Sequence, residues 1–127
     1  MSWFKRIIGL EGDGIALTLV NDDNFKDEIS NSKIPVVLDL WSPGCQPCKQ
    51  LAPIMVDLQR KYKDKIKVAQ CDISAAPGIA QRLRVRGTPT VLYFKNGKVV
   101  ERVVGFRGSL YHTEIIETDL LGKEFSI

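Results

Sequence analysis

The chain has 127 residues, 44% of them hydrophobic and 26% charged, with a formal net charge of +3 at pH 7. This length and composition suit one soluble globular domain whose core needs no disulfide or metal support. Its three cysteines are too few for a disulfide-framed secreted module. Its modest positive charge falls short of the signal of a nucleic-acid-binding domain, so we expect no nucleic-acid partner.

Residues 1–14 read as an N-terminal extension and residues 15–127 as the folded domain. The apolar run after Lys5 and Arg6 covers only Ile7–Leu10, which is too short for a signal peptide. No stretch approaches the roughly 18 apolar residues of a membrane-spanning helix, so we expect a cytoplasmic protein without membrane contact. Four apolar residues of the extension share one helical face, which suits an amphipathic anchor, an arm packed on the domain or a disordered arm. They are Trp3, Phe4, Ile7 and Ile8.

The first elements are predicted from short apolar runs and capping residues. In chain order they are a strand at Ile15–Val20, a helix through Phe25 and Ile29, and a strand at Pro35–Trp41. Side-chain oxygens of Asn21–Asp23 are suited to cap the helix. The second strand is dense in valine and leucine, as expected of a strand that is covered on both faces.

A longer helix is predicted after residue 45, because apolar residues recur there at spacings of three and four. They are Cys48, Leu51, Met55, Leu58 and Tyr62. Pro53 lies inside this helix and should kink it, since proline lacks an N–H group and its ring crowds the preceding turn.

The rest of the chain reads as further strands and helices with a hairpin near the end. The elements are a strand at Ile66–Ile73, a short helix opened by Pro77, strands at Pro89–Phe94 and Lys98–Val104, and a final helix that Ser109 can cap. Asn96-Gly97 between the last two strands is a strong hairpin signal. This order predicts an α/β fold with a mixed, mostly parallel central sheet, helices on both faces and a closing antiparallel hairpin.

The sequence Cys45-Gln46-Pro47-Cys48 follows the buried strand and opens the long helix. Two cysteines three positions apart at a helix start can bring their sulfurs to bonding distance. The first thiol then lies at the helix N-terminus, where free N–H groups and the helix dipole stabilise the nucleophilic thiolate. The second lies one turn inside and is expected to be more buried. The spacing therefore indicates a redox-active pair.

Two other interpretations of the pair are half of a zinc site and two incidental core cysteines. A structural zinc site needs four ligands, and the remaining cysteine and histidine, Cys71 and His112, are isolated from each other in the sequence. Pro47 also removes a backbone N–H group that a zinc knuckle would use. We therefore favour redox chemistry and expect neither a metal nor a cofactor.

Several stretches, in the order of the chain, resemble thioredoxins. They are Val37–Lys49 with Ala52-Pro53, then Arg86–Thr90, then Phe94–Gly97 and Val104-Gly105. The resemblance runs from about Ile15 to Leu121. It implies the thioredoxin fold and a dithiol–disulfide exchange activity.

The resemblance also implies roles for individual residues. Cys45 is the attacking cysteine, Cys48 the resolving one, and Asp39 a buried carboxyl group that takes and returns the Cys48 proton. Since the strand around Asp39 is otherwise apolar, burial should raise the pKa of this carboxyl group; the alternative is a partly exposed aspartate without a chemical role. The residues implied in substrate binding are Trp41, Gly44, Gln46, Pro47, Thr88, Pro89 and Gly105.

Within that set, Pro89 resembles a proline that follows a cis peptide bond and faces the disulfide. In such a loop the Thr88 backbone can pair with an extended substrate segment, as an added β-strand does. Trp41 resembles a tryptophan packed beside the active site, with a plain core residue as the alternative. Gly105 resembles a glycine that lines the substrate groove, with a simple strand-end turn as the alternative.

Three positions depart from the usual thioredoxin pattern. Gly44 stands where a tryptophan precedes the first cysteine, and Gln46 stands where a glycine follows it. Losing the aromatic side chain beside Cys45 removes a contact surface for partners. Gln70 stands where many thioredoxins carry a lysine near the buried aspartate. Without that cation Asp39 should be harder to ionise.

These observations predict a monomeric, thioredoxin-like protein disulfide reductase. Its expected partners are disulfide-containing target proteins and an NADPH-dependent flavin reductase that restores the dithiol. One alternative runs the same cysteine pair toward oxidation or isomerisation of disulfides. Another is a non-catalytic binding module on a thioredoxin scaffold, which the apolar N-terminal face would serve.

Three further features have both a plain and a functional interpretation. Cys71 reads as a small buried hydrophobic residue, with regulatory oxidation as the alternative. His112, near the start of the last helix, reads as a packing or surface residue, with ligation of a metal as the alternative. Arg82, Arg84 and Arg86 read as a solvated edge next to the active-site loop, with steering of an acidic partner as the alternative.

Overall fold

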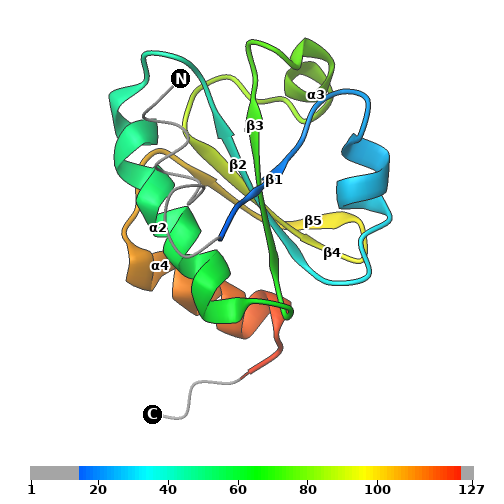
Figure 1. The fold of residues 1–127 in the computed structure, drawn as a ribbon, viewed down its shortest axis with the longest axis vertical. Helices are drawn as coiled ribbons and strands as arrows, with labels where there is room; N and C mark the ends of the chain where they lie inside the picture. The colour runs from blue at the N-terminus through cyan, green and yellow to red at the C-terminus, as the bar shows by residue number, and fades with distance from the viewer. Residues whose placement is uncertain (1–14, 124–127) are drawn as a thin grey trace.

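The computed structural model describes residues 15–123, so the apolar face at residues 3–8 lies outside the described residues and the domain boundary at residue 15 stays a prediction. Within this range one sheet has five strands in the order β1-β3-β2-β4-β5 (Figure 1). Their bounds are Thr18–Leu19 for β1, Val36–Trp41 for β2, Lys67–Asp72 for β3, Thr90–Lys95 for β4 and Lys98–Val104 for β5. β3 pairs with β1 and β2 in parallel, whereas β4 pairs with β2 and β5 antiparallel. The mixed sheet is confirmed, and among the described strands β4 alone runs against the others.

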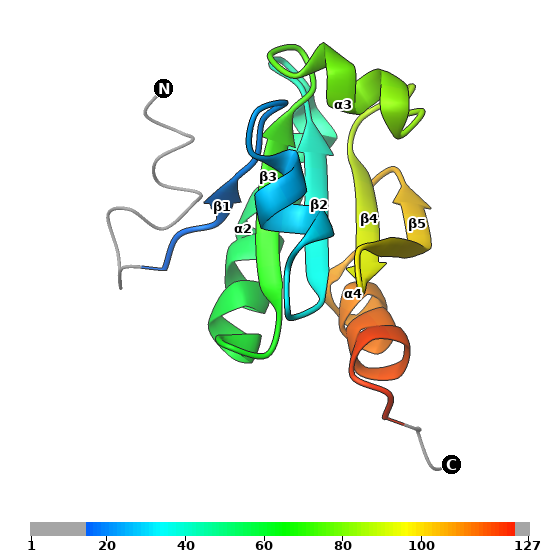
Figure 2. The same ribbon diagram turned by 90° about the vertical axis from the view of Figure 1, so that its right-hand side faces the viewer.

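Helices cover both faces of this sheet. They are α2 (Gln46–Tyr62), α3 (Pro77–Arg82), α4 (Ser109–Ile115) and two π-helical turns, η1 (Lys26–Ser30) and η2 (Ile116–Leu120). In Figure 2, η1 lies in front of the sheet and α2 behind it. Val37 of β2 packs in the core on the side of α2 and η2, and Leu38 in the core on the side of η1 and α3. Because alternate residues of one strand serve two cores, the strand is apolar at every position except Asp39.

Two predicted helix caps are wrong. Asn21 Oδ1 accepts the backbone N–H groups of Asp23 and Asn24 at 2.8 and 2.9 Å, in the turn before η1. The N-cap residue of η1 itself is Phe25, which has no side-chain cap hydrogen bond, so the predicted cap of this helix by Asn21–Asp23 is wrong. The Ser109 prediction is wrong, because the backbone turns from extended to helical at Gly108 and Ser109 is already the first residue of α4. Gly108 is the N-cap residue, and it supplies no side-chain hydrogen bond.

The strand boundaries also differ, most at β1 and by one residue at one or both ends of β2, β3 and β4. β1 contains two residues, fewer than the six of the predicted strand, although the Val20 N–H group still donates to the Gln70 carbonyl at 2.9 Å. β4 begins at Thr90, one residue after Pro89, and proline has no N–H group to donate to a neighbouring strand. Pro53 lies inside α2 as expected, and the kink that it should cause stays a prediction.

The predicted Asn96-Gly97 turn joins β4 to β5. Asn96 and Gly97 have φ angles of 54° and 77°, as a two-residue hairpin turn of the right twist requires. A Cβ atom at Gly97 would also lie 2.7 Å from the Ser30 carbonyl oxygen, so glycine is needed there for space as well as for its φ angle. The antiparallel hairpin is therefore confirmed together with its physical cause.

The ends of four elements, β2, α2, β4 and β5, meet at one end of the sheet. This arrangement positions the cysteine pair. The carboxyl end of β2 leads into the N-terminus of α2, and the start of β4 lies next to the end of β5. None of the helices within residues 15–123 is both long and apolar enough to span a membrane.

Candidate active site

Cys45 and Cys48 form a disulfide at the N-terminus of α2, with their Cα atoms 5.3 Å apart. Cys45 is the N-cap residue of the helix, and its Sγ accepts the backbone N–H group of Cys48 at 3.2 Å. Cys45 is partly exposed, whereas Cys48 is only 2% exposed. The structure therefore confirms the predicted pairing, and it gives the first sulfur both access to solvent and a helix-terminal hydrogen bond.

The turn between β2 and α2 explains the unusual glycine before the first cysteine. Gly44 has a φ angle of +77°, a conformation that costs little for glycine and more for residues with a Cβ atom. No heavy atom lies within 4 Å of the position that a Cβ atom of Gly44 would occupy. Gly44, Gln46 and Pro47 are all exposed around the disulfide, so a partner can reach them. Their role in substrate binding stays a prediction.

A second loop lies against this turn. The Thr88–Pro89 peptide bond is cis, as the resemblance implied. The Thr88 hydroxyl shares a hydrogen bond of 2.7 Å with the Ser42 hydroxyl, which precedes the cysteines. The Gly105 N–H group donates to the Pro89 carbonyl at 2.9 Å and so ties the loop to the end of β5. The site thus brings Thr88, Pro89 and Gly105 together across long sequence separations.

Ser42 is a site residue that the sequence interpretation missed. It sits two residues before Gly44 and directly after β2, and serine is common in turns for local reasons. Only the pairing with Thr88, which is 46 positions away, distinguishes it from an ordinary turn residue. No local sequence signal could have found this contact.

Asp39 lies in β2 beneath this end of the sheet and is 3% exposed. Burial raises the pKa of its carboxyl group from 3.8 to about 7. Its Oδ1 atom has no hydrogen-bond partner among the described residues. The buried aspartate with a raised pKa is therefore confirmed, and its part in proton transfer stays a prediction.

Two further polar side chains lie next to Asp39. Gln70 of β3 is its register partner in the parallel pair, so the two side chains emerge on the same face of the sheet. The Trp41 indole N–H group donates to Gln70 Oε1 at 2.5 Å, and the amide nitrogen Nε2 of Gln70 is buried without a partner among the described residues. Trp41 itself is only 5% exposed, so its predicted contact with substrate stays untested.

Comparison with known proteins agrees with this geometry. The family model described as thioredoxin matches residues 16–117. The chain belongs to the thioredoxin family. It carries the thioredoxin-type dithiol–disulfide pair, Cys45 and Cys48, at the start of its second helical segment.

Curated relatives of this thioredoxin domain come from chloroplasts and cyanobacteria, among other sources. Thioredoxin M-type of Spinacia oleracea is 43% identical over 86 residues, which are 68% of this chain and 48% of that protein. Thioredoxin M-type of Chlamydomonas reinhardtii is 38% identical over 68% of this chain and 61% of that protein. Thioredoxin 1 of Synechococcus elongatus is 38% identical over 68% of this chain and 80% of that protein. The chain thus spans about half to four fifths of the length of these three relatives.

Cys71 and His112 lie outside the cysteine pair. Cys71 is a buried free thiol in the core on the side of η1 and α3, and burial, together with the charges of Asp22 and Asp72, raises its pKa to about 11. A neutral buried thiol is a poor nucleophile. The residues described here contain no group of three or more His, Cys, Asp or Glu that could hold a metal ion.

His112 is a fully buried residue of α4. Its Nδ1 atom shares a hydrogen bond with the Tyr93 hydroxyl, and burial lowers its pKa from 6.5 to about 4. Of the two plain interpretations of His112, a packing residue or a surface residue, the packing role is therefore the correct one.

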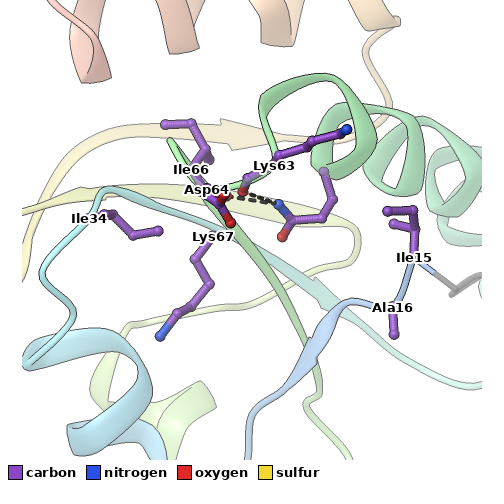
Figure 3. Close-up of a pocket in the computed structure, with 8 residues that line it drawn as sticks. Ile15, Ala16, Ile34, Lys63, Asp64, Ile66 and Lys67 are labelled. Carbon is purple, nitrogen blue, oxygen red and sulfur yellow. Dashed lines mark hydrogen bonds between the residues drawn. The ribbon is translucent and has the colours of Figure 1, made fainter.

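A cavity of about 470 Å³ lies at the far end of the sheet from the disulfide, where α2 ends and β3 begins. Figure 3 shows Ile15 and Ala16 on one side of it and Ile34 and Ile66 on the other. The Gln59 amide crosses this region and donates to the carbonyl groups of Lys63 and Ile66 at 2.9 and 2.8 Å. These bonds hold the α2–β3 connection together, and no cysteine lines the cavity.

Proposed function

We propose that this protein reduces disulfides of target proteins by dithiol–disulfide exchange through Cys45 and Cys48. The observation that carries the proposal is the placement of Cys45: partly exposed, at the N-cap of α2, with a backbone N–H group on its sulfur. That environment favours the thiolate and leaves it accessible to a target.

The first step is attack by the Cys45 thiolate on one sulfur of the target disulfide. A bond forms between Cys45 Sγ and that sulfur, and the target disulfide bond breaks. The second target sulfur leaves as a thiolate and takes a proton from solvent. The product is a mixed disulfide between protein and target.

The second step releases the target. Cys48 transfers its proton to Asp39 and attacks Cys45 Sγ, so that the Cys45–Cys48 bond forms and the mixed disulfide breaks. The departing target thiolate receives the proton back from Asp39. Overall, two electrons pass from the dithiol to the target. A carboxyl group with a pKa of about 7 suits this exchange, because it can accept and return a proton near neutral pH.

The target segment binds as an extended strand beside the Thr88–Pro89 loop. Support comes from the Ser42–Thr88 hydrogen bond, which holds the loop next to the cysteine turn. Gly105 also leaves room, since no heavy atom lies within 4 Å of the place where its Cβ atom would be. Backbone pairing of this kind accepts many target sequences, because it reads no side chain.

A separate reductase must return electrons to the Cys45–Cys48 disulfide. The partner in this proposal is an NADPH-dependent flavin reductase, and the protein acts as a monomer in the cytoplasm, without contact with membranes or nucleic acid. The unpaired Cys71 thiol suits a compartment that keeps thiols reduced. Reduction of the disulfide by such a reductase with NADPH tests the partner. Cell fractionation tests the location, and sedimentation of the purified protein tests the monomeric state. Recovery with membranes or as an oligomer would contradict them.

The activity test compares reduction of insulin disulfides, with dithiothreitol as the electron source, by the wild type, Cys45→Ser and Cys71→Ser. We expect Cys45→Ser to lose the catalysed rate and Cys71→Ser to keep it. Equal rates for wild type and Cys45→Ser would contradict the function. They would favour the binding-module alternative, above all if partners are still captured by a variant without both active-site cysteines.

The direction of electron flow is tested by the reduction potential of the pair. A potential near about −270 mV supports a reductant, and one near about −120 mV supports the alternative, an oxidant of target thiols. Reduction is proposed because Pro47 between the cysteines goes with reducing members of the family that the sequence resembles.

The Asp39 step is tested with Asp39→Asn, which removes the proton acceptor and keeps the size of the side chain. We expect the second step to slow by about 10- to 100-fold at neutral pH, so that the mixed disulfide accumulates. Quenched-flow trapping and mass spectrometry measure that species. Asp27→Asn, an exposed aspartate, is the matched control. No accumulation in Asp39→Asn would remove Asp39 from the mechanism.

A further inference from the structure

A hollow of about 390 Å³ lies beside the Thr88–Pro89 loop, on the side of α3. Its walls come from the connection between α3 and β4 and from the last residues of β5, whose arrowhead points toward that connection in Figure 2. The lining residues are Arg84, Arg86, Gly87, Thr90, Arg102 and Val104. Three of the six are arginines, and none is acidic.

These arginines come from distant parts of the chain. Arg84 and Arg86 follow the end of α3, and Arg102 lies on β5, an edge strand of the sheet. Arg102 Nη2 donates to the Leu83 carbonyl at 2.6 Å, which fixes its guanidinium group over the hollow. Within the described residues, none of the three forms an ion pair.

Arg82 belongs to a different environment. Its guanidinium carbon lies 5.4 Å from the centre of the Phe25 ring, a distance that suits a cation–π contact. The sequence series Arg82, Arg84 and Arg86 therefore divides in the fold. The first packs on the core of the η1 side, and the other two join Arg102.

We infer that this hollow binds a carboxylate side chain that a target protein carries close to its disulfide. Three guanidinium groups around one space repel each other unless an anion enters. The planar guanidinium group pairs with a carboxylate through two parallel hydrogen bonds. A surface groove of one charge also attracts and orients the opposite charge.

The position of the hollow links the carboxylate to the redox step. Gly87 and Thr90 line it, and they enclose the Thr88–Pro89 pair along which the proposed target segment lies. The inference thus rests on the proposed function and adds a preference to it. Backbone pairing admits any extended segment, whereas the arginine hollow selects segments with an acidic residue near the target cysteine.

The experiment uses two synthetic peptide dimers, each joined by one disulfide. One has glutamate residues flanking the cysteine, and the other has glutamine at the same positions. Reduction of each dimer by the full chain is followed by chromatography, with dithiothreitol as the electron source. The measured quantity is the ratio of kcat/KM for the glutamate dimer to that for the glutamine dimer.

We expect a ratio of about three to ten for the wild type at low salt, because exposed charge pairs contribute modestly and act mainly on association. The ratio should fall toward one in the double variant Arg84→Gln/Arg102→Gln and on addition of sodium chloride. Lys98→Gln removes one charge at the opposite, exposed end of β5 and should keep the wild-type ratio. Arg84→Gln alone is a second variant, in which the hydrogen bond from Arg102 to Leu83 is kept. The Arg84 side chain makes no hydrogen bond within the described residues, so this variant removes a charge and no such bond.

A wild-type ratio near one would overturn the inference, as would an unchanged ratio in both arginine variants. An equal fall in Lys98→Gln would also overturn it, because the effect would then follow net charge and not the hollow. If the wild type reduces neither dimer, the proposed function itself fails. If it reduces both equally, only the arginine site fails.

Discussion

Gln70 of β3 is bonded at one end of its amide and unpartnered at the other. Its Oε1 atom accepts the Trp41 indole N–H group, and its Nε2 atom is buried without a hydrogen-bond partner in the described part of the chain. The tryptophan therefore sets which way the amide points. Since Asp39 is the register partner of Gln70, the residue next to the buried carboxyl group is a neutral donor and not a cation.

A charge change at Gln70 should alter the ionisation of Asp39. In Gln70→Lys the nearby ammonium group stabilises the carboxylate, so we expect the pKa of Asp39 to fall by about one to three pH units from its raised value. Gln70→Met, of similar size and without charge, should leave the pKa raised. Infrared or NMR titration of the Asp39 carboxyl group measures the difference. A pKa equally raised in both variants would show that Gln70 does not act on Asp39.

At the scale of elements, α3 depends on a side chain from another part of the chain. Its own N-cap residue, Ala76, has no side chain that can cap. The Asp22 carboxylate, 57 positions before Ile79, accepts the backbone N–H groups of Gly78 and Ile79 at 3.2 and 2.8 Å. This contact places a negative charge at the positive end of a short helix. It also fixes the start of the segment that leads to the Thr88–Pro89 loop.

Removal of this cap should destabilise the domain. Asp22→Ala leaves two N–H groups at the start of α3 without their acceptor, and we expect the free energy of unfolding to fall by about 1 kcal/mol. Urea unfolding measures the change. Asp23→Ala is the control, because Asp23 is a neighbouring exposed aspartate whose side chain accepts no hydrogen bond from α3 within the described residues. A loss of the same size in both variants would contradict a specific role for Asp22.

For the whole molecule, two buried groups give the stability opposite dependences on pH. The pKa of His112 is lowered from 6.5 to about 4, so the unfolded chain binds more protons between these values and stability rises with pH. The pKa of Asp39 is raised from 3.8 to about 7, so the folded chain holds more protons and stability falls with pH over nearly the same range. The two effects offset each other in the wild type.

Asp39→Asn should therefore expose the contribution of His112. We expect the free energy of unfolding of this variant to rise more steeply than that of the wild type between about pH 4.5 and about pH 6.5. Above about pH 7 the variant should be the more stable protein, because the wild type must bury a carboxylate. Urea unfolding across this range measures both effects.

The His112 part of this argument has a direct check. His112 is the single histidine of the chain, so its ring signals in NMR spectra need no assignment by mutation. We expect the His112 ring of the folded protein not to titrate near pH 6.5, because burial lowers its pKa to about 4. A folded-state pKa at the ordinary histidine value would contradict the burial effect.

Much of the fold could be predicted because its signals are local. The apolar run of β2 reports a strand between two helix layers, the repeat from Cys48 to Tyr62 reports an amphipathic helix, and Asn96-Gly97 reports a hairpin turn. The wrong prediction of Ser109 as the N-cap residue of α4 also comes from a local signal. A capping residue type indicates that a helix starts nearby, whereas the first helical residue is set by where the backbone leaves the extended conformation.

The sequence by itself determined the order of the elements, the cysteine pair at a helix start and the aspartate in an apolar strand, because each depends on residues close together in the chain. The tertiary structure alone decided which distant groups meet. It joined Ser42 to Thr88, Trp41 to Gln70 and Asp22 to α3. It also separated Arg82 from Arg84 and Arg86 and brought Arg102 to the latter two. Such contacts depend on strand order and register, which no local pattern of residues encodes.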